Sequence, residues 1–403
     1  MDAQIKNCQN CEKEFIITQD DQQFYAKVQV PTPTFCPDCR LKRRLVWRNE
    51  RTLYRNNCDL CKKSIVSIYH KDSTYTVYCQ KCWWGDGWDG LEYARDIDWE
   101  KPFFEQLNSL INDIPKLGLP SDYPSLINSE YSNWCGDLKN CFLITDADYV
   151  EDSAYGSGLF QVKDCFDCGN ITESELCYES FNLRKCYKTF YSVDCRDCID
   201  VLFSKNCSNC TNCFGCVNLK NKSYNIFNKQ YSKEEYFDKI NELFGGSYNK
   251  LKEIQSKMKN LWLEYPQKYF RGHSNVNSSG DYIYNSKNAK NTFLASNVED
   301  SKFISLLHSK STKDCYDYTD WGDTAQRLYE CMSVGLGADS IKFSHMIIKS
   351  VREVEYSYYC VTSSNLFGCA SLRNKQYCIL NKQYTKEEYE ELAPKIRRHM
   401  GGD

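Results

Sequence analysis

Residues 214–236 read FGCVNLKNKSYNIFNKQYSKEEY, and residues 367–389 read FGCASLRNKQYCILNKQYTKEEY. The two stretches agree at 16 of 23 positions, which indicates an internal duplication. The duplicated unit covers about 120 residues, from Asn128 to Leu243 and again from Val276 to about Ile396. Repetition on this scale predicts a repeat architecture for most of the chain, because repeats of this kind bury a core only against their neighbours.

A shorter period of 21 positions lies inside the first copy. It relates Cys165 to Cys186 and Cys207, and also the apolar and basic series Phe160, Phe181, Leu202 and Lys163, Arg184, Lys205. Identical residue types at a fixed spacing, with Ser, Asn and Asp at turns, are typical of a β-solenoid. The sequence therefore predicts a mainly β protein with a duplicated β-solenoid (β-helix) whose coils hold about 21 residues. The register is weaker in the second copy.

Short helices are expected to close each copy. Ser232 with Glu235, and Thr385 with Glu388, have the spacing of a capping box at a helix start. Such a helix covers the last coil, which would otherwise expose an open sheet edge. Between the copies, a second amphipathic helix is predicted from residues at helical spacing: Tyr248, Leu251, Ile254, Met258 and Leu261.

All eight cysteines of the first 95 residues lie in CxxC pairs. Two such pairs place four thiolates around one ion, which predicts two closed tetrahedral Zn²⁺ sites per chain with no open position for catalysis. The predicted ligands are Cys8, Cys11, Cys36 and Cys39 for the first ion, and Cys58, Cys61, Cys79 and Cys82 for the second. Residues 13–30 and 62–78 each suggest a β-hairpin between the pairs, and this order is similar to a treble-clef zinc finger, twice in tandem.

A strongly basic stretch follows Cys39. Residues 36–63 hold nine Lys or Arg against three acids, a local charge of 9 − 3 = +6. On a helix, five arginines would fall within one arc beside Trp47, and Arg forks with an indole suit phosphate and base contacts. The predicted nucleic-acid-binding residues are Arg40, Arg43, Arg44, Trp47, Arg48, Arg51 and Arg55. The alternative is that these arginines pair with the acidic connector (Asp86, Asp89, Glu92, Asp96 and Asp98) and that Trp47 belongs to a core.

Composition excludes several protein classes. Lys plus Arg is 51 and Asp plus Glu is 54, so the net charge of −3 does not fit a globally basic nucleic-acid coat. The 25 cysteines, an odd number mostly in CxxC pairs or at regular intervals, do not fit a secreted disulfide framework. The chain has neither a signal-peptide pattern nor an apolar run of about 18 residues. We therefore expect a cytoplasmic protein with no membrane partner.

No catalytic motif stands out. The five histidines are scattered, and neither a P-loop nor a GxSxG motif occurs. The run CSNCTNCFGC (Cys207, Cys210, Cys213 and Cys216) is similar to the cysteine run of ferredoxins, but its last gap is two residues and no Pro follows. We interpret these cysteines as stacked small side chains, with a thiol or iron–sulfur role as an alternative. Neither an enzyme nor a small-molecule substrate is predicted.

Three stretches, CPDCRLKRRLVWRNERTLY (36–54), VYCQKCWW (77–84) and the closing run 214–236, resemble an uncharacterised bacterial family of zinc-ribbon or treble-clef proteins with Cys-rich C-terminal repeats. The resemblance covers nearly the whole chain. It implies a paired zinc-binding head, with the eight N-terminal cysteines in the motif positions, followed by Cys-rich repeats. It implies no established activity.

The sequence thus predicts five segments: a tandem treble-clef domain (1–95), an aromatic and acidic helical connector (96–127), the first solenoid copy with its capping helix (128–247), a bracing helix and linker (248–275), and the second copy with its capping helix (276–403). The predicted function is non-enzymatic binding of nucleic acid through the Arg-rich helix, with structured RNA, possibly ribosomal, favoured over DNA. The alternative is a scaffold that binds a protein partner on the solenoid face.

Overall fold

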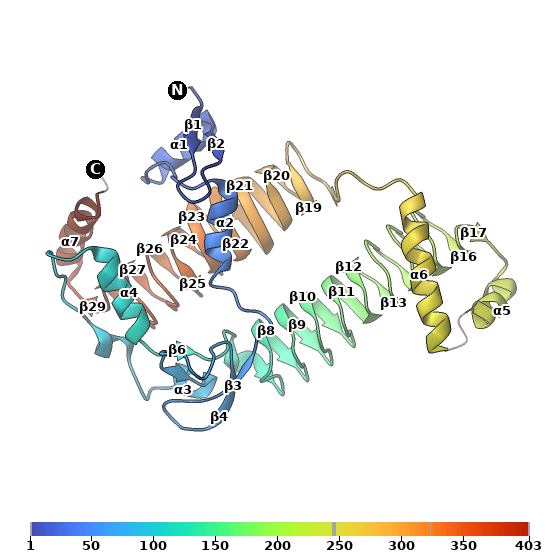
Figure 1. Ribbon diagram of the computed structural model, residues 1–403, viewed down its shortest axis with the longest axis horizontal. Helices are drawn as coiled ribbons and strands as arrows, with labels where there is room; N and C mark the ends of the chain where they lie inside the picture. Colours follow the sequence, from blue (N-terminus) through green and yellow to red (C-terminus); the bar gives the residue numbers. More distant parts are fainter. Residues whose placement is uncertain (1, 244–246, 323, 402–403) are drawn as a thin grey trace.

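The computed structural model describes residues 2–243, 247–322 and 324–401, and within them the protein is mainly β. Residues 244–246, inside the predicted first copy, and residue 323, inside the second, lie outside the described residues. Figure 1 shows two small N-terminal modules, a helical connector and two long stacks of strands. The first module comprises β1 (Gln4–Asn7), β2 (Glu14–Ile17), α1 (Gln19–Lys27) and α2 (Pro37–Leu45), and the second β3 (Tyr54–Asn57), β4 (Ser64–Ser67), β5 (Val77–Tyr78) and α3 (Gln80–Trp84).

The hairpin of each module lies one element earlier than predicted. β1 pairs antiparallel with β2, and β3 with β4, so each hairpin encloses the first CxxC pair of its module. Residues 13–30 do not form a hairpin, because Thr18 and Asp21 form a capping box that starts α1. Residues 62–78 do not form one either, since β5 pairs with β6 (Lys116–Leu117) of the connector. The capping residues Thr18 and Asp21 were present in the sequence, and in residues 13–30 they outweighed the alternating apolar pattern that suggested a hairpin.

The connector contains η1 (Gly90–Tyr93), α4 (Phe103–Asp113), β6 and η2 (Tyr123–Ser125). The helix predicted in this region is α4. Phe103, Leu107 and Leu110 are buried, whereas Phe104 is exposed. The helix therefore turns its Phe103 side toward the rest of the protein.

The first stack runs through the middle of the chain. Its strands from β7 to β16 pair parallel, in sequence order except that β11 pairs with both β12 and β13, and each residue pairs with the residue 12 positions later, as Leu159 does with Ile171. Only the short last strand is antiparallel to its neighbour. The strands are β7 (Leu126–Ile127), β8 (Asn133–Lys139), β9 (Thr145–Glu151), β10 (Ser157–Lys163), β11 (Gly169–Tyr178), β12 (Phe181–Arg184), β13 (Tyr187–Phe190), β14 (Ile199–Leu202), β15 (Thr211–Phe214), β16 (Ser223–Ile226) and β17 (Lys229–Gln230).

The coil length predicted from the sequence is wrong, because the pairing repeat is 12 rather than 21. Every third residue has a left-handed backbone, as at Asp164 and Asp167, and the residue after it is buried, as at Cys165 and Cys168. Asp and Asn tolerate this conformation better than other non-Gly residues. A spacing of 21 is one repeat of 12 plus three steps of three, so it relates two inward positions on different sides of the stack.

The second stack repeats this arrangement with longer repeats. Tyr316 pairs with Tyr329 and Tyr329 with Lys342, so the pairing repeat rises to 13 at these strands. The strands are β18 (Gly272–His273), β19 (Gly280–Tyr284), β20 (Lys287–Lys290), β21 (Thr292–Lys313), β22 (Cys315–Trp321), β23 (Leu328–Val334), β24 (Asp339–Lys342), β25 (His345–Ile347), β26 (Arg352–Glu355), β27 (Ser364–Phe367), β28 (Gln376–Ile379) and β29 (Lys382–Gln383).

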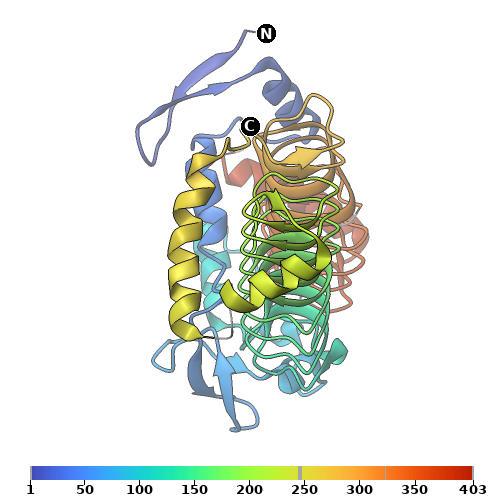
Figure 2. The same cartoon turned by 90° about the vertical axis from the view of Figure 1, so that its right-hand side faces the viewer.

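Helices follow both stacks as predicted. α5 (Lys233–Leu243) follows the first stack and α7 (Lys386–His399) follows the second, and both have the expected capping contacts, with Ser232 bonded to Glu235 and Thr385 to Glu388. The predicted helix between the copies is α6 (Tyr248–Glu264), which buries Ile254 and Met258. Figure 2 shows α6 beside the stacks and α5 across the near end of the first stack.

The duplicated Phe-Gly pair lies under a helix in both copies. A Cβ on Gly368 would lie 2.4 Å from Cζ of Phe103 in α4, and a Cβ on Gly215 would lie 3.2 Å from Sδ of Met258 in α6. Both glycines have a φ of +62°. Glycine at these two positions therefore serves both the left-handed backbone and the close approach of a helix.

Within the described part of the chain, no helix is long and apolar enough to cross a membrane.

Candidate metal centres and the docked basic helix

The first cysteine tetrad is assembled from a hairpin and a helix start. Cys8 and Cys11 lie in the tight turn after β1, where Glu12 has a left-handed backbone and its N–H donates to the Cys8 carbonyl. Cys36 is the N-cap residue of α2, and Cys39 lies in its first turn. The second CxxC pair therefore starts α2.

The second tetrad has the same construction. Lys62 follows Cys58 and Cys61 with a left-handed backbone, and its N–H donates to the Cys58 carbonyl. Cys79 caps α3, and its sulfur accepts from the N–H of Cys82 at 3.4 Å. Two unrelated stretches of sequence thus build one local geometry, which is set by the spacing of the cysteines.

Both tetrads have the dimensions of a zinc site. The four Sγ atoms of each set lie within 4.8 Å of one another. A tetrahedral ion with Zn–S bonds of about 2.3 Å separates its sulfurs by about 3.8 Å. The Sγ atoms of Cys11 and Cys36 are 3.8 Å apart, and those of Cys61 and Cys79 are 3.9 Å apart. The two groups therefore fit two zinc ions, held by the eight predicted cysteines.

Backbone and amide donors surround the sulfurs of both tetrads. The N–H of Cys36 donates to Cys8 Sγ and that of Cys79 to Cys58 Sγ, both at 3.2 Å, and Asn10 Nδ2 donates to Cys39 Sγ at 3.3 Å. Burial acts to raise the pKa of Cys8, but backbone N–H donors outweigh it and lower that pKa to about 6. Zinc binds the thiolate, so the donors around Cys8 favour the form that the metal needs.

Comparison with known families supports this interpretation for the first module. A family model described as "Probable treble clef domain" matches residues 2–46, which contain the first tetrad. No curated protein matches the chain. The chain is therefore a zinc-binding protein with a treble-clef domain at its N-terminus, and the resemblance to a bacterial family over the remaining length stays a prediction.

The basic helix α2 docks on the second stack. Arg40 Nε donates to Asp317 Oδ2 at 2.9 Å, and Arg44 Nη1 donates to Asp317 Oδ1 at 3.2 Å. The Arg40 side chain is 1% exposed and that of Asp317 is 0% exposed. Burial opposes the charge of Arg40, but Asp317 outweighs it and raises the Arg40 pKa. Both oxygens of one buried carboxylate are thus held by two arginines of α2.

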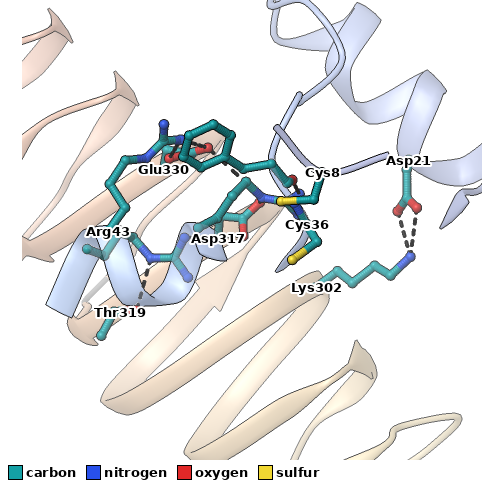
Figure 3. A network of polar contacts seen from close by, with 11 residues as sticks. Cys8, Asp21, Cys36, Arg43, Lys302, Asp317, Thr319 and Glu330 are labelled. Carbon is teal, nitrogen blue, oxygen red and sulfur yellow. Dashed lines mark hydrogen bonds and ion pairs between the residues drawn. The ribbon is translucent and has the colours of Figure 1, made fainter. Parts of the chain in front are cut away.

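Further contacts fix the first module in this position. Arg43 pairs with Glu330, and Lys302 Nζ lies 2.7 Å from Asp21 Oδ1 of α1. Figure 3 shows these contacts between the module and the strands beneath it. The ring of Phe24 stacks on Tyr316, with centroids 3.8 Å apart. Aromatic packing and ion pairs therefore act together at this interface.

Arg48, just beyond α2, joins the two stacks. Its Nη1 lies 2.7 Å from Asp320 of the second stack, and its Nη2 lies 3.4 Å from Asp146 of the first. Glu50 pairs with Nε, and the guanidinium lies 5.4 Å from the ring centroid of Trp134. The Arg48 side chain is 3% exposed. A single arginine therefore contacts acids of both stacks.

The structure does not bring the predicted nucleic-acid-binding residues onto one exposed arc. Arg40, Arg44 and Arg48 are buried in ion pairs. α2 ends at Leu45, so Arg51 and Arg55 lie outside the helix, and Arg55 belongs to β3. Arg43 is half exposed and Trp47 is 46% exposed, with its ring 5.5 Å from that of His345.

The alternative of internal pairing was correct in kind, but the partners differ from the predicted ones. They are not the acids of the connector. They are Asp317, Asp320 and Glu330 of the second stack, together with Asp146 of the first stack and Glu50, both beside Arg48. A sequence signal was present, since an acid directly follows a tyrosine at Tyr316–Asp317 and again, one repeat later, at Tyr329–Glu330. This signal could be interpreted only with the correct repeat length, which was predicted as 21 instead of 12 or 13.

The cysteines of CSNCTNCFGC face the interior of the first stack. Cys207, Cys210, Cys213 and Cys216 are all buried. In the described part of the chain, the groups of three or more possible ligands whose donor atoms converge are the two N-terminal tetrads. The four cysteines occupy successive inward positions three residues apart, together with other apolar residues of the first-stack core.

Proposed function

We propose that this protein is a non-enzymatic, zinc-stabilised scaffold that binds protein partners on the outer faces of its two stacks. The observation that carries the proposal is the docking of α2. Its arginines Arg40 and Arg44 are engaged by Asp317 inside the molecule. The zinc module thus serves to hold the second stack, and the stacks supply the extended surfaces available to partners.

We further propose that each stack is a β-solenoid. Three observations support this: the parallel pairing of successive strands, the constant register of 12 in the first stack, and the burial of every third side chain. Together they give four inward residues per repeat. In a solenoid each repeat contacts only its neighbouring repeats, so the whole stack presents a long, rigid outer surface of the kind that a scaffold protein requires.

The joining of the two stacks supports the same function. Arg48 contacts Asp146 and Asp320, one acid from each stack. Farther along the first stack, Arg271 lies 3.3 Å from Asp194, and the rings of Phe181 and Tyr282 lie 6.1 Å apart. Contacts at two separate places hold the stacks in a fixed relation, which preorganises any surface that they share and reduces the entropic cost of binding.

Site-specific photocrosslinking in the source cell tests the scaffold. A benzophenone amino acid replaces Phe166 on the first stack or Arg51 in the linker after α2, in otherwise unchanged full-length protein. The scaffold predicts discrete protein adducts at Phe166 that survive nuclease and disappear with protease. A Tyr187 replacement, on another side of the same stack, serves as the matched control. Adducts at Phe166 that nuclease removes would refute the proposal.

Nucleic-acid binding remains the second candidate, and one observation favours it. Lys42, Arg51 and Arg55 are exposed and make no ion pair within the described residues, and Trp47 is partly exposed nearby. If these residues bind phosphate, the affinity for RNA falls steeply with salt, and the triple change Lys42→Glu, Arg51→Glu and Arg55→Glu reduces that slope. A slope unchanged by the triple variant removes this candidate.

A further inference from the structure

The duplication allows equivalent positions of the two stacks to be identified residue by residue. From Phe214, four pairing steps lead back through Leu202, Phe190 and Tyr178 to Phe166. From Phe367, the equivalent residue of the second copy, four steps lead back through Glu355, Lys342 and Tyr329 to Tyr316. Phe166 is therefore equivalent to Tyr316, and Tyr178 to Tyr329.

The residues that follow these aromatics match as well. Asp167 and Glu179 on the first stack are equivalent to Asp317 and Glu330 on the second. One repeat earlier, Tyr155 is equivalent to Phe303, because Ala154 pairs with Phe166 as Lys302 pairs with Tyr316. All six residues have a left-handed backbone. Each stack thus carries a column in the order aromatic, Asp, Glu, which we call the acidic column.

On the second stack, the acidic column is the docking site of α2. The Arg40 guanidinium lies 5.2 Å from the ring centroid of Phe303 and bonds to Asp317. Arg43 pairs with Glu330. Every member of this column is therefore used to hold an arginine, and the neighbouring Tyr316 receives an aromatic ring from α1.

On the first stack, the acidic column is open to solvent. Tyr155 is 53% exposed, and Asp167 and Glu179 are also exposed. Asp167 makes no ion pair within the described residues, and Glu179 accepts a long bond, 3.4 Å, from Gln255 of α6 besides its contact with the adjacent Tyr178. The three residues border a groove of about 560 Å³ between the stacks, which Arg51 also lines, with Leu294 and Leu306 on its far side.

Exposed aromatic residues extend this surface. Phe166, next to Asp167, is 43% exposed, and Phe142 is 41% exposed. Phe142 contacts Tyr155, with ring centroids 5.8 Å apart, and Tyr131 contacts Phe142 at 5.4 Å. At its other end the surface continues to Phe203 and Phe214, which α6 covers. The open region is therefore the uncovered part of a face that already receives a helix.

We propose that the acidic column of the first stack, Tyr155, Asp167 and Glu179, docks an Arg-rich helix of a partner protein. The inference rests on the proposed scaffold function and names the chemistry of the partner: arginines at the i, i+3 and i+4 spacing of Arg40, Arg43 and Arg44. An arginine over Tyr155 gains a cation–π contact, and the two carboxylates accept guanidinium forks. The protein's own α2 is not the occupant, because its arginines are held by the second stack.

Fluorescence anisotropy with the zinc-loaded, full-length protein tests this proposal. The probe is an Ala-rich helical peptide of about 20 residues, long enough to form a helix, with three Arg at the α2 spacing. A matched peptide carries Glu at those positions. The protein variant is Asp167→Lys with Glu179→Lys, and the control variant, Glu151→Lys with Glu175→Lys, makes the same charge change on a neighbouring side of the first stack.

We expect the Arg peptide to bind the wild-type protein, the Glu peptide not to bind, and the Asp167→Lys, Glu179→Lys variant to lose about tenfold or more in affinity, while the control variant stays within about threefold. No binding of the Arg peptide, or equal loss in both variants, overturns the proposal. A dimer that sedimentation detects and that the Asp167→Lys, Glu179→Lys change dissociates also overturns it, because the column is then covered by a second copy. The scaffold itself fails only if Phe166 yields no protein adduct, so the two failures are distinguishable.

Discussion

The substitution Arg40→Leu tests the docking of the zinc module most directly. It removes a guanidinium that bonds to Asp317 at 2.9 Å and leaves a carboxylate that is 0% exposed. Removing one partner of a buried pair costs about 3–5 kcal/mol. Because Arg44 remains 3.2 Å from the other oxygen of Asp317, we take the lower end, about 3 kcal/mol.

Hydrogen exchange of the α2 amides, read by mass spectrometry on the zinc-loaded protein, measures this loss locally. A loss of about 3 kcal/mol increases their exchange rate about 150-fold, since about 1.4 kcal/mol corresponds to a factor of ten. The substitution Arg55→Leu removes an exposed arginine nearby and is expected to change exchange less than about threefold.

The double variant Arg40→Leu, Asp317→Leu removes both charges and is expected to recover much of the lost protection, because no buried charge is left without its partner. Exchange in Arg40→Leu that matches the wild type would refute the claim that the ion pair holds the module on the second stack.

Three further predictions concern the metal, the repeats and pH. Native protein is expected to contain two zinc ions by mass spectrometry, and Cys11→Ser to contain one, since the tetrads share no ligand; two ions in the variant would contradict this. Gly368→Ala is expected to cost about 1–3 kcal/mol more than Gly337→Ala in urea unfolding, because both have positive φ but only the first Cβ meets a neighbour, Phe103; equal costs would contradict this. Burial lowers the pKa of His345 to about 3, so between about pH 6.5 and pH 3 the imidazole of the unfolded protein binds a proton that the folded one does not. The free energy of unfolding therefore decreases as the pH is lowered through this range, by up to about 1.4 kcal/mol per pH unit. His345→Gln is expected to have a shallower dependence than the wild type in urea unfolding between pH 7 and pH 5, and an unchanged dependence would refute the assignment.

Local signals in the sequence predicted local structure well. The CxxC spacing identified both tetrads, because two residues between cysteines suffice to bring their sulfurs to one ion. Ser232 with Glu235 and Thr385 with Glu388 identified two helix starts, and residues at helical spacing identified α6. Each of these features depends on contacts within a few residues, or on one ion that its ligands share. They can therefore be recognised without knowing which distant residues pair.

The repeat length and the partners of the buried arginines, which depend on long-range pairing, were not predicted. The burial of every third residue, such as Cys165 and Cys168, gives many spacings that are multiples of three, and 21 is one of them. The repeat of 12 follows from how four such steps close around the core. Steps of 12 do occur in the sequence, as from Cys186 to Cys198 and Cys210, but they were interpreted as parts of a 21-residue coil. Asp317, the partner of Arg40, lies 277 residues later in the chain, on a repeat whose outward column becomes visible only once the repeat length is known.

The same separation affects the order in which the protein is made. Arg44 bonds to Thr319, 275 residues later in the chain. At about 5–20 residues per second, roughly 14–55 s pass between synthesis of α2 and synthesis of its docking site. Throughout that interval the arginines of α2 lack their partners on the second stack. The nascent chain therefore presents a cationic surface that is buried in the folded protein. Any factor that binds Arg-rich helices in the cell thus meets two different molecules, one during translation and one after it.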